Sequence, residues 1–178
     1  VFIDHVGIPT LACIRPAVDA LNDLGMREEV QLIVSGGIRS GADVAKVLAL
    51  GADAVSIGSA ALIAIGDNDP KWETEYKELG TTAGAFDDWH LGNDPAGITT
   101  QDPELMKRVD PIKAGERLAN YLRVITLEAQ TIARASGKSH LKNLEPEDLC
   151  ALTVEAAAMA RVPLAGTNWI PGKDGYTT

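Results

Sequence analysis

A strand, a glycine turn and a helix occur twice in close succession within residues 32–62, and this repetition constrains the fold more than any other feature. The segment reads LIVSGGIRSGADVAKVLALGADAVSIGSAAL. Apolar runs at residues 31–34 and 54–57 predict two buried strands, each followed by glycine. Helical spacing over residues 42–50 and 59–65 predicts a helix after each turn. Buried strands that alternate with helices indicate a parallel sheet in an α/β fold.

The two glycine turns have the composition of a phosphate site. In a parallel strand–turn–helix unit, the turn lies beside the free amides and the positive dipole end of the next helix. Glycine lets the backbone approach an anion closely and adopt positive φ. Two neighbouring turns of this kind can bind one phosphate from both sides, as the loops after the last two strands of a (β/α)₈ barrel do. One such turn alone would be better explained as a structural turn, but two in tandem favour phosphate binding.

Three side chains in these turns have two interpretations each. Ser35 and Ser59 either donate hydrogen bonds to phosphate oxygens or cap helices. Arg39 either adds positive charge to the site or is a solvated residue at the start of a helix.

Composition excludes several classes of partner. The chain has 178 residues and a net charge of −9, and its basic residues form no block, which argues against nucleic acid and membrane surfaces as partners. Its two cysteines, Cys13 and Cys150, form no disulfide framework, redox motif or zinc motif. We therefore expect a reducing, cytoplasmic compartment, and the opening residues VFIDHVG show no signal peptide.

The chain after residue 66 is predicted to be mainly helical. Helices are expected over residues 71–79, over 116–135 with a wide buried face, and from Pro146 to just before Pro163. A further helix is expected earlier, over residues 16–24. The tail from residue 165 onward is rich in glycine and proline, and is expected to be irregular.

Several residues whose side chains could serve in a catalytic or metal site are better explained by structural roles. Aspartates before Pro103 and Pro111 have the N-cap signature of a helix start. Cys150 and Met159 are expected in the core, and Glu128 is expected to be solvated. The FDDWH segment carries Asp87, Asp88 and His90, which suggests a metal site, but adjacent carboxylates cannot both point at one ion from a regular element. We expect a surface loop there, with no metal, and a substrate-facing role for Trp89 or His90 stays open.

Length limits the architecture. A (β/α)₈ barrel takes about 250 residues, whereas this chain has only two convincing strands before Ile65. We therefore expect the C-terminal part of such a barrel, its last two strands, followed by an α-helical extension. The remaining strands would come from the same polypeptide or from another chain. Most of the catalytic site would then lie upstream, so no catalytic residue is assigned.

The stretch SGGIRSGADVAKVLALGADAVSIGSAALIAIG, followed by DPAGITTQDPEL, closely resembles the FMN-binding domain of the glutamate synthase family. The resemblance runs from Asp4 to the tail, and GITTQDPEL distinguishes it from other FMN barrels. It implies that FMN is the cofactor and that its phosphate contacts the matching turn residues. These are Ser35, Gly36, Gly37, Ile38, Arg39, Gly58, Ser59 and Ala60.

Redox-active members of that family hold a three-iron–four-sulfur cluster with three cysteines after the last barrel helix. The first would follow Gly66 and the last would precede Pro95, where this chain has Asp67 and Asp94. No cysteine lies between Cys13 and Cys150, and such clusters need thiolates, so we expect no iron–sulfur cluster on this chain. The resemblance therefore implies three segments: 1–66, part of the FMN-binding barrel; 67–102, replacing the iron–sulfur region; and 103–178, the helical extension and tail.

Within the family, the chain is most similar to the FMN subunit of members that act as methylamine–glutamate N-methyltransferases. That resemblance implies amine exchange on glutamate, with glutamate or 2-oxoglutarate as substrate and other glutamate-synthase-like subunits as partners. Three alternatives stay open: a conventional glutamate synthase, a barrel of the IMP dehydrogenase type, and a non-catalytic module that holds subunits together. The second needs a cysteine nucleophile on a barrel loop, and the residues around Cys13 match no such signature.

Overall fold

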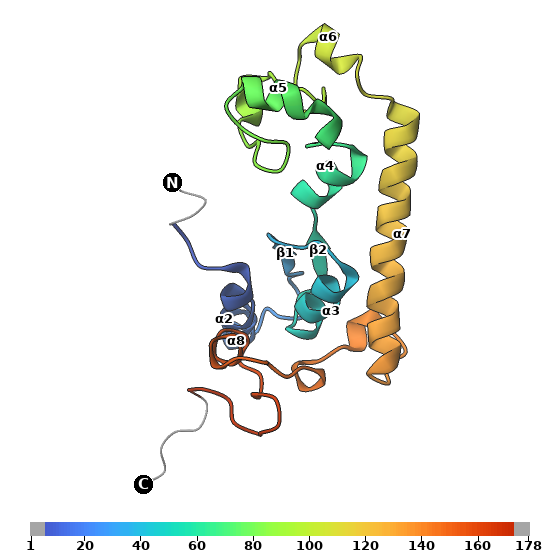
Figure 1. The fold of residues 1–178 in the computed structure, drawn as a ribbon. Coiled ribbons are helices and arrows are strands. Elements are labelled where there is room, and N and C mark those ends of the chain that lie inside the picture. Colours follow the sequence, from blue (N-terminus) through green and yellow to red (C-terminus); the bar gives the residue numbers. More distant parts are fainter. Residues whose placement is uncertain (1–5, 173–178) are drawn as a thin grey trace. The chain divides into compact units, whose positions relative to one another are not determined.

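The computed structural model describes residues 6–172, so the first residues of the lead-in and the last residues of the tail lie outside the description (Figure 1). The chain forms two compact units, residues 1–57 with 125–178, and residues 58–124. The strands are β1 (Ile33–Ser35) and β2 (Ala54–Ser56). The α-helices are α2 (Thr10–Asp23), α3 (Gly41–Ala49), α4 (Ser59–Ile65), α5 (Glu73–Glu78), α6 (Pro103–Met106), α7 (Pro111–Ala135) and α8 (Val154–Ala160). Short 3₁₀ helices are η1 (Pro70–Trp72), η2 (Trp89–Leu91), η3 (Leu141–Asn143) and η4 (Pro146–Asp148).

The two strands form a parallel sheet, which confirms the α/β prediction. Ile33 pairs with Ala54, and Ser35 pairs with Ser56, so both strands end at the same edge of the sheet. The prediction that both strands are buried is wrong within residues 6–172. Val34 is 7% exposed, but Ile33 is 61% exposed, because nothing in the described chain covers that face of β1.

The core of the first unit lies between α2, β1, α3 and α8. Its buried members include Ile14, Val34, Leu50 and Val162. Small residues allow α3 and α7 to approach closely. A Cβ on Gly41 would lie 2.3 Å from the carbonyl oxygen of Ile125, so only glycine fits there.

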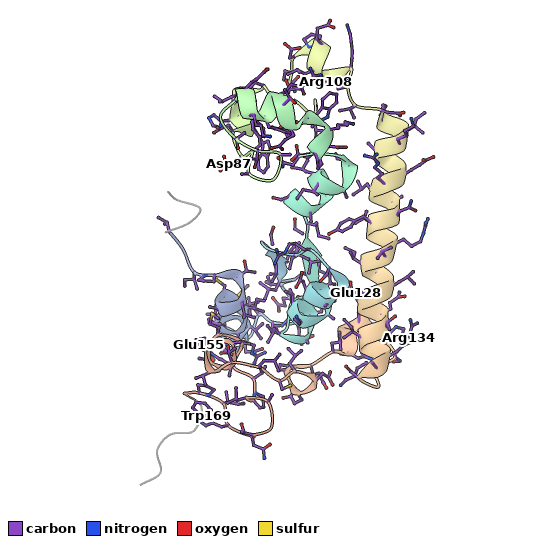
Figure 2. The ribbon with its side chains drawn as sticks, viewed as in Figure 1. Asp87, Arg108, Glu128, Arg134, Glu155 and Trp169 are labelled. Atoms are coloured by element: carbon purple, nitrogen blue, oxygen red, sulfur yellow. The ribbon has the colours of Figure 1, made fainter. Side chains whose placement is uncertain are left out.

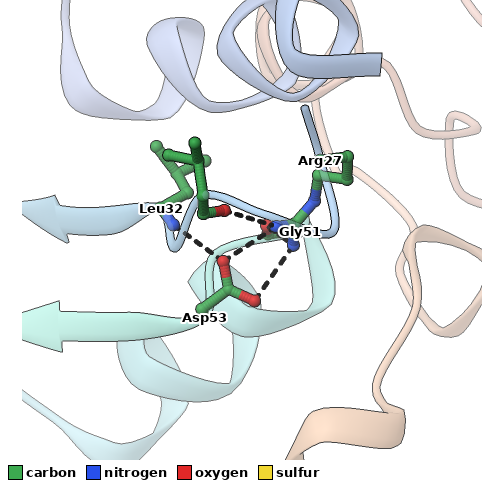
Figure 3. Close-up of polar contacts among 5 residues, drawn as sticks. Arg27, Leu32, Gly51 and Asp53 are labelled. Atoms are coloured by element: carbon green, nitrogen blue, oxygen red, sulfur yellow. Dashed lines mark hydrogen bonds and ion pairs between the residues drawn. The ribbon is translucent and has the colours of Figure 1, made fainter. Parts of the chain in front are cut away.

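The sheet is fixed at the end where its strands begin (Figure 3). Arg27 donates to both carboxylate oxygens of Asp53, at 2.9 and 3.1 Å, and to the carbonyl of Gly51 at 3.0 Å. The same carboxylate accepts the Leu32 amide at 2.7 Å. The hydrogen bonds from Arg27, and then that from Leu32, hold the pKa of Asp53 below its usual value. This network joins the loop before β1 to the loop before β2.

The second unit has its own small core. Tyr76, Ala83 and Phe86 are buried together, and Trp72 and Trp89 pack against them. Asp102 accepts the amides of Glu104 and Leu105, which confirms the predicted N-cap of α6. Asp110 does the same at α7, where it accepts the amides of Ile112 and Lys113. Both caps also confirm the use of proline as the first helical residue.

Several boundaries differ from the sequence predictions. Helix α2 begins at Thr10 and includes Pro16, because Ile14 in its second turn is drawn into the core. The predicted C-terminal helix is replaced by η4 and the shorter α8. Ala151 instead pairs with Leu164 in a parallel bridge, and the Thr153 side chain caps α8 by accepting the Ala156 amide.

Burial also differs from prediction in two places. Cys150 is exposed, because it lies in the extended stretch between η4 and α8 and not on a helix face. Helix α7 buries a narrow stripe of Ile125, Ala129 and Ala133, whereas Leu122 and Leu127 are 43% and 51% exposed. The expected wide buried face is therefore not covered by any part of residues 6–172.

Candidate functional site

The first glycine turn leaves the sheet at the edge where both strands end. Ser35 is exposed, and its carbonyl accepts the Thr10 hydroxyl at 3.4 Å. Gly36 and Gly37 have φ values of +112° and +75°, which L side chains rarely adopt. A Cβ on Gly36 would also lie 2.6 Å from the Thr10 hydroxyl oxygen. The double glycine is therefore required by the backbone path, as the sequence predicted for a close-approach turn.

The amides of this turn fall into two groups. Those of Arg39 and Ser40 donate to the Asp43 carboxylate, at 3.0 and 3.1 Å. Those of Gly36, Gly37 and Ile38 find no acceptor within residues 6–172. The Ile38 side chain is 6% exposed and lies in the core, so only its backbone can face a ligand. These three amides without an acceptor all come before α3.

Glu128 accepts a further amide, at the first residue of α3, and sequence reasoning missed this contact. Glu128, labelled in Figure 2, was expected to be merely solvated, but its carboxylate accepts the Gly41 amide at 2.7 Å. With the Ser40 capping box, this bond occupies the start of α3 with the protein's own carboxylates. No local signal could have shown this contact, because 87 residues separate the two partners.

The second glycine turn opens the second unit. Gly58 precedes α4 with φ −110° and ψ −91°, and the helix begins without a side-chain cap. The amides of Ser59 and Ala60, in its first turn, find no acceptor in the described part of the chain. An ideal Cβ on Gly58 would meet nothing within 4 Å. The second turn thus also presents open backbone donors in an uncrowded place.

The comparisons with known proteins place the chain in a family. Residues 1–71 and 83–139 match the family described as "Conserved region in glutamate synthase". The chain therefore belongs to the glutamate synthase family. No solved structure matches it significantly.

Named relatives agree with this membership. The chain is 81% identical over 176 residues to a "Glutamate synthase large subunit-like protein" of Rhizobium meliloti, covering 99% of this chain and 40% of the relative. It is 40% identical over 144 residues to an archaeal glutamate synthase (NADPH) of Methanocaldococcus jannaschii, covering 81% of this chain and 25% of the relative. The chain thus spans less than half the length of these relatives.

The first turn fits the phosphate of a flavin nucleotide. Three consecutive amides without an acceptor, on a backbone that only glycine can follow, form an anion-binding concavity of the kind that successive N–H groups make. The site residues predicted from sequence belong to both units, Ser35 to Arg39 to the first and Gly58 to Ala60 to the second.

The residues at the iron–sulfur positions do not fit a cluster. Asp67 and Asp94 are 2% and 0% exposed. Asp94 accepts five hydrogen bonds, from the amides of Ala96, Ile98 and Thr99 and from the hydroxyls of Tyr76 and Thr99. Both oxygens are thereby occupied, and neither residue offers the thiolate that a cluster needs. This segment is held by an oxygen-based hydrogen-bond network.

Asp67 lies in the same buried region but is poorly satisfied. Its Oδ2 accepts the Asn68 side-chain amide at 3.3 Å, and its Oδ1 has no partner in the described chain. Burial, and then the negative charge of Asp94, raise the pKa of Asp67 to about 6. Burial and the Asp94 charge also raise the pKa of Tyr76. The carboxyl of Asp67 therefore changes charge in a pH range where ordinary carboxyls do not.

The FDDWH segment forms a short 3₁₀ turn with mixed burial. Phe86 is in the core of the second unit, whereas Asp87, Asp88 and His90 are exposed. Within residues 6–172, no three His, Cys, Asp or Glu side chains gather as a metal site. The same residues include no helix long and apolar enough to cross a membrane.

Proposed function

We propose that this chain supplies the last two strands of a (β/α)₈ barrel, and that their two glycine turns bind the phosphate of FMN. The proposal is supported by the parallel register of β1 and β2, by the open amides after each strand, and by family membership. Such barrels bind phosphate at the carboxyl ends of their last strands. The exposed face of β1 would be covered by the remaining strands, from the same polypeptide or a partner.

In this proposal the chain's own residues hold the cofactor and do not perform the chemistry. The amides of Gly36, Gly37 and Ile38 in the first turn, and those of Ser59 and Ala60 in the second, would donate to phosphate oxygens. Bound FMN would supply reversible hydride transfer with an amino acid carbon. The catalytic residues would lie in the rest of the protein, since the carboxylates near this region, Asp43 and Glu128, are committed to backbone amides.

We further propose that the whole enzyme exchanges the amine of glutamate, taking methylamine in and releasing ammonia to form N-methylglutamate. The observation that carries this proposal is the absence of cysteine between Cys13 and Cys150, with an oxygen-based network at the cluster positions. Without a cluster ligated here, this chain supplies no electron route to an external donor. An exchange that oxidises and then reduces the same carbon needs no net electrons.

The second candidate is a conventional glutamate synthase that forms glutamate from 2-oxoglutarate. It is favoured by the 40% identity to a relative named as an NADPH glutamate synthase. In that case reducing equivalents would reach the flavin through another chain.

The two reactions are separated by giving the intact complex glutamate and methylamine with no nicotinamide or ferredoxin. We expect N-methylglutamate and ammonia in equal amounts, measured by mass spectrometry and an ammonia assay. A parallel reaction without methylamine is the control. Strict dependence on added reductant, with 2-oxoglutarate consumed and glutamate made, would contradict amine exchange and support the second candidate.

A further inference from the structure

Basic side chains line a cavity in the second unit, and none of its lining residues belongs to the proposed phosphate site. It has a volume of about 290 Å³. Its basic lining consists of Lys71 from η1, Arg108 after α6, and Lys113 and Arg117 from the first turns of α7. Residues 58–124 contain seven basic and twelve acidic side chains, so four of the seven cations line one cavity in an acidic unit. Such a concentration opposes the charge of its surroundings.

The acidic side chains nearby do not cancel this charge. Three of the cations have carboxylate partners: Lys71 with Asp69 at 3.6 Å, Arg108 with Glu75 at 3.3 Å, and Lys113 with Asp110 at 3.5 Å. Of those carboxylates, only Asp110 lines the cavity. Arg117 makes no ion pair or hydrogen bond with a residue that the structure describes. The cavity therefore contains a guanidinium whose donors are available to a ligand.

The guanidinium of Arg108 is held in place before any ligand arrives, and that of Arg117 lies beside Gly66. Arg108, labelled in Figure 2, lies 4.6 Å from the centre of the Trp72 ring and donates to the carbonyl of Pro95 at 2.8 Å. The Nη1 atom of Arg117 lies 3.3 Å from the position that a Cβ on Gly66 would occupy. Gly66 ends α4 with φ +116°, so Arg117 lies against a backbone that has no side chain. Positioning of this kind lowers the entropic cost of binding.

The ligand would be held by side chains and not by the amides of α7. Asp110 already accepts the amides of Ile112 and Lys113, so the start of that helix is occupied. The rest of the lining is apolar, with Ile65, Ile98, Val109 and Ala114. A charged centre with apolar walls suits a small ligand that carries one anionic group.

We propose that this cavity is a second anion-binding site, for the carboxylate or phosphate group of a small molecule, with Arg117 as its principal contact. The planar guanidinium matches both groups through two parallel hydrogen bonds. Lys71, Lys113 and Arg108 add the surrounding positive potential. The site is independent of FMN and would persist whichever amine reaction the enzyme catalyses.

The test is calorimetric titration of the intact, FMN-loaded protein with inorganic phosphate and, separately, with succinate. Three forms are compared: wild type, Arg117→Gln, and Arg123→Gln as a control on the same helix outside the cavity. We expect at least one probe to bind wild type, with about tenfold weaker binding in Arg117→Gln, the loss of one charged contact. Arg123→Gln should bind within twofold of wild type.

The probes also distinguish the two chemistries. A loss confined to phosphate in Arg117→Gln identifies a phosphate site, and a loss confined to succinate identifies a carboxylate site. Arg117→Lys, which keeps the charge without the planar fork, should lie between wild type and Arg117→Gln. Equal binding by wild type and Arg117→Gln, or no binding of either probe to wild type, would overturn the proposal.

Discussion

The polar groups at the two ends of the β1–β2 sheet differ in their hydrogen bonding. At the end where the strands begin, Asp53 joins the Arg27 guanidinium to the Leu32 amide. At the end where they finish, Ser35 and Ser56 are exposed and the amides of the next turn lack acceptors. At the first end the chain's own side chains satisfy the polar groups, whereas at the second end the backbone amides are available to a ligand. This polarity is that of α/β folds, which bind ligands beyond the carboxyl ends of their strands.

The two buried carboxylates of the second unit differ in their hydrogen bonding in the same way. Asp94 accepts five hydrogen bonds, whereas one oxygen of Asp67 has no partner in the described chain. A buried carboxylate whose oxygens all accept hydrogen bonds stabilises the fold, whereas one with an unpaired oxygen costs free energy when it is charged. Three substitutions test these two comparisons.

The largest effect is expected at Asp94, the carboxylate that accepts five hydrogen bonds. Asp94→Ala would leave three amides and two hydroxyls without their acceptor in a buried place, and should lower the free energy of unfolding by roughly 3–5 kcal/mol. Chemical denaturation of the intact protein measures this loss. Asp87→Ala, at an exposed aspartate of the same unit, is the control and should change stability by less than about 0.5 kcal/mol. Equal stability of the two variants would mean that the hydrogen-bond network contributes little.

A smaller loss is expected at the fixed end of the sheet. Asp53→Ala removes the acceptor of Arg27 and Leu32, and should cost roughly 1–2 kcal/mol, reduced by solvent because the site is partly exposed. Since the pKa of Asp53 is lowered in the folded state, its contribution is present above the unfolded pKa of about 4 and lost as pH falls through the lowered value. Stability curves of both forms between pH 2 and 7 should therefore converge in acid. A constant difference over that range would argue against the ion pair.

The smallest effect, of opposite sign, is expected at Asp67. Its pKa is raised to about 6, so the protonated form stabilises the fold fully below pH about 4, and that stability is lost as pH rises through 6. Asp67→Asn mimics the neutral form and should gain about 1 kcal/mol at pH 7, but little at pH 4. Thermal unfolding at both pH values measures this change. A variant that loses stability at pH 7 would show that the charged carboxylate has a stabilising partner.

Short sequence patterns predicted the elements that depend on interactions between residues close together in the chain. Both strands, the glycine turns and the aspartate caps at Asp102 and Asp110 follow from short patterns, and the structure contains them all. What failed depended on distant contacts. The bond from Gly41 to Glu128 joins distant parts of the chain, and the Ala151–Leu164 bridge replaced a helix that periodicity favoured. The buried pair Asp67 and Asp94 was located by resemblance, but its hydrogen bonds depend on the folded loop.

The central claim is that the open amides of the glycine turns hold the FMN phosphate. Ser59→Pro tests it most directly, because proline is tolerated as the first residue of a helix and removes the Ser59 amide donor. Ser59→Ala, the matched control, keeps that amide, and Gly37→Val and Gly58→Val block the close approach of the backbone. The measurement is flavin content per chain of the purified intact protein, with the dissociation constant from fluorescence titration. The account predicts full flavin in Ser59→Ala, about tenfold weaker binding in Ser59→Pro, and flavin loss in both glycine variants. Wild-type flavin affinity in Ser59→Pro and in both glycine variants would contradict it.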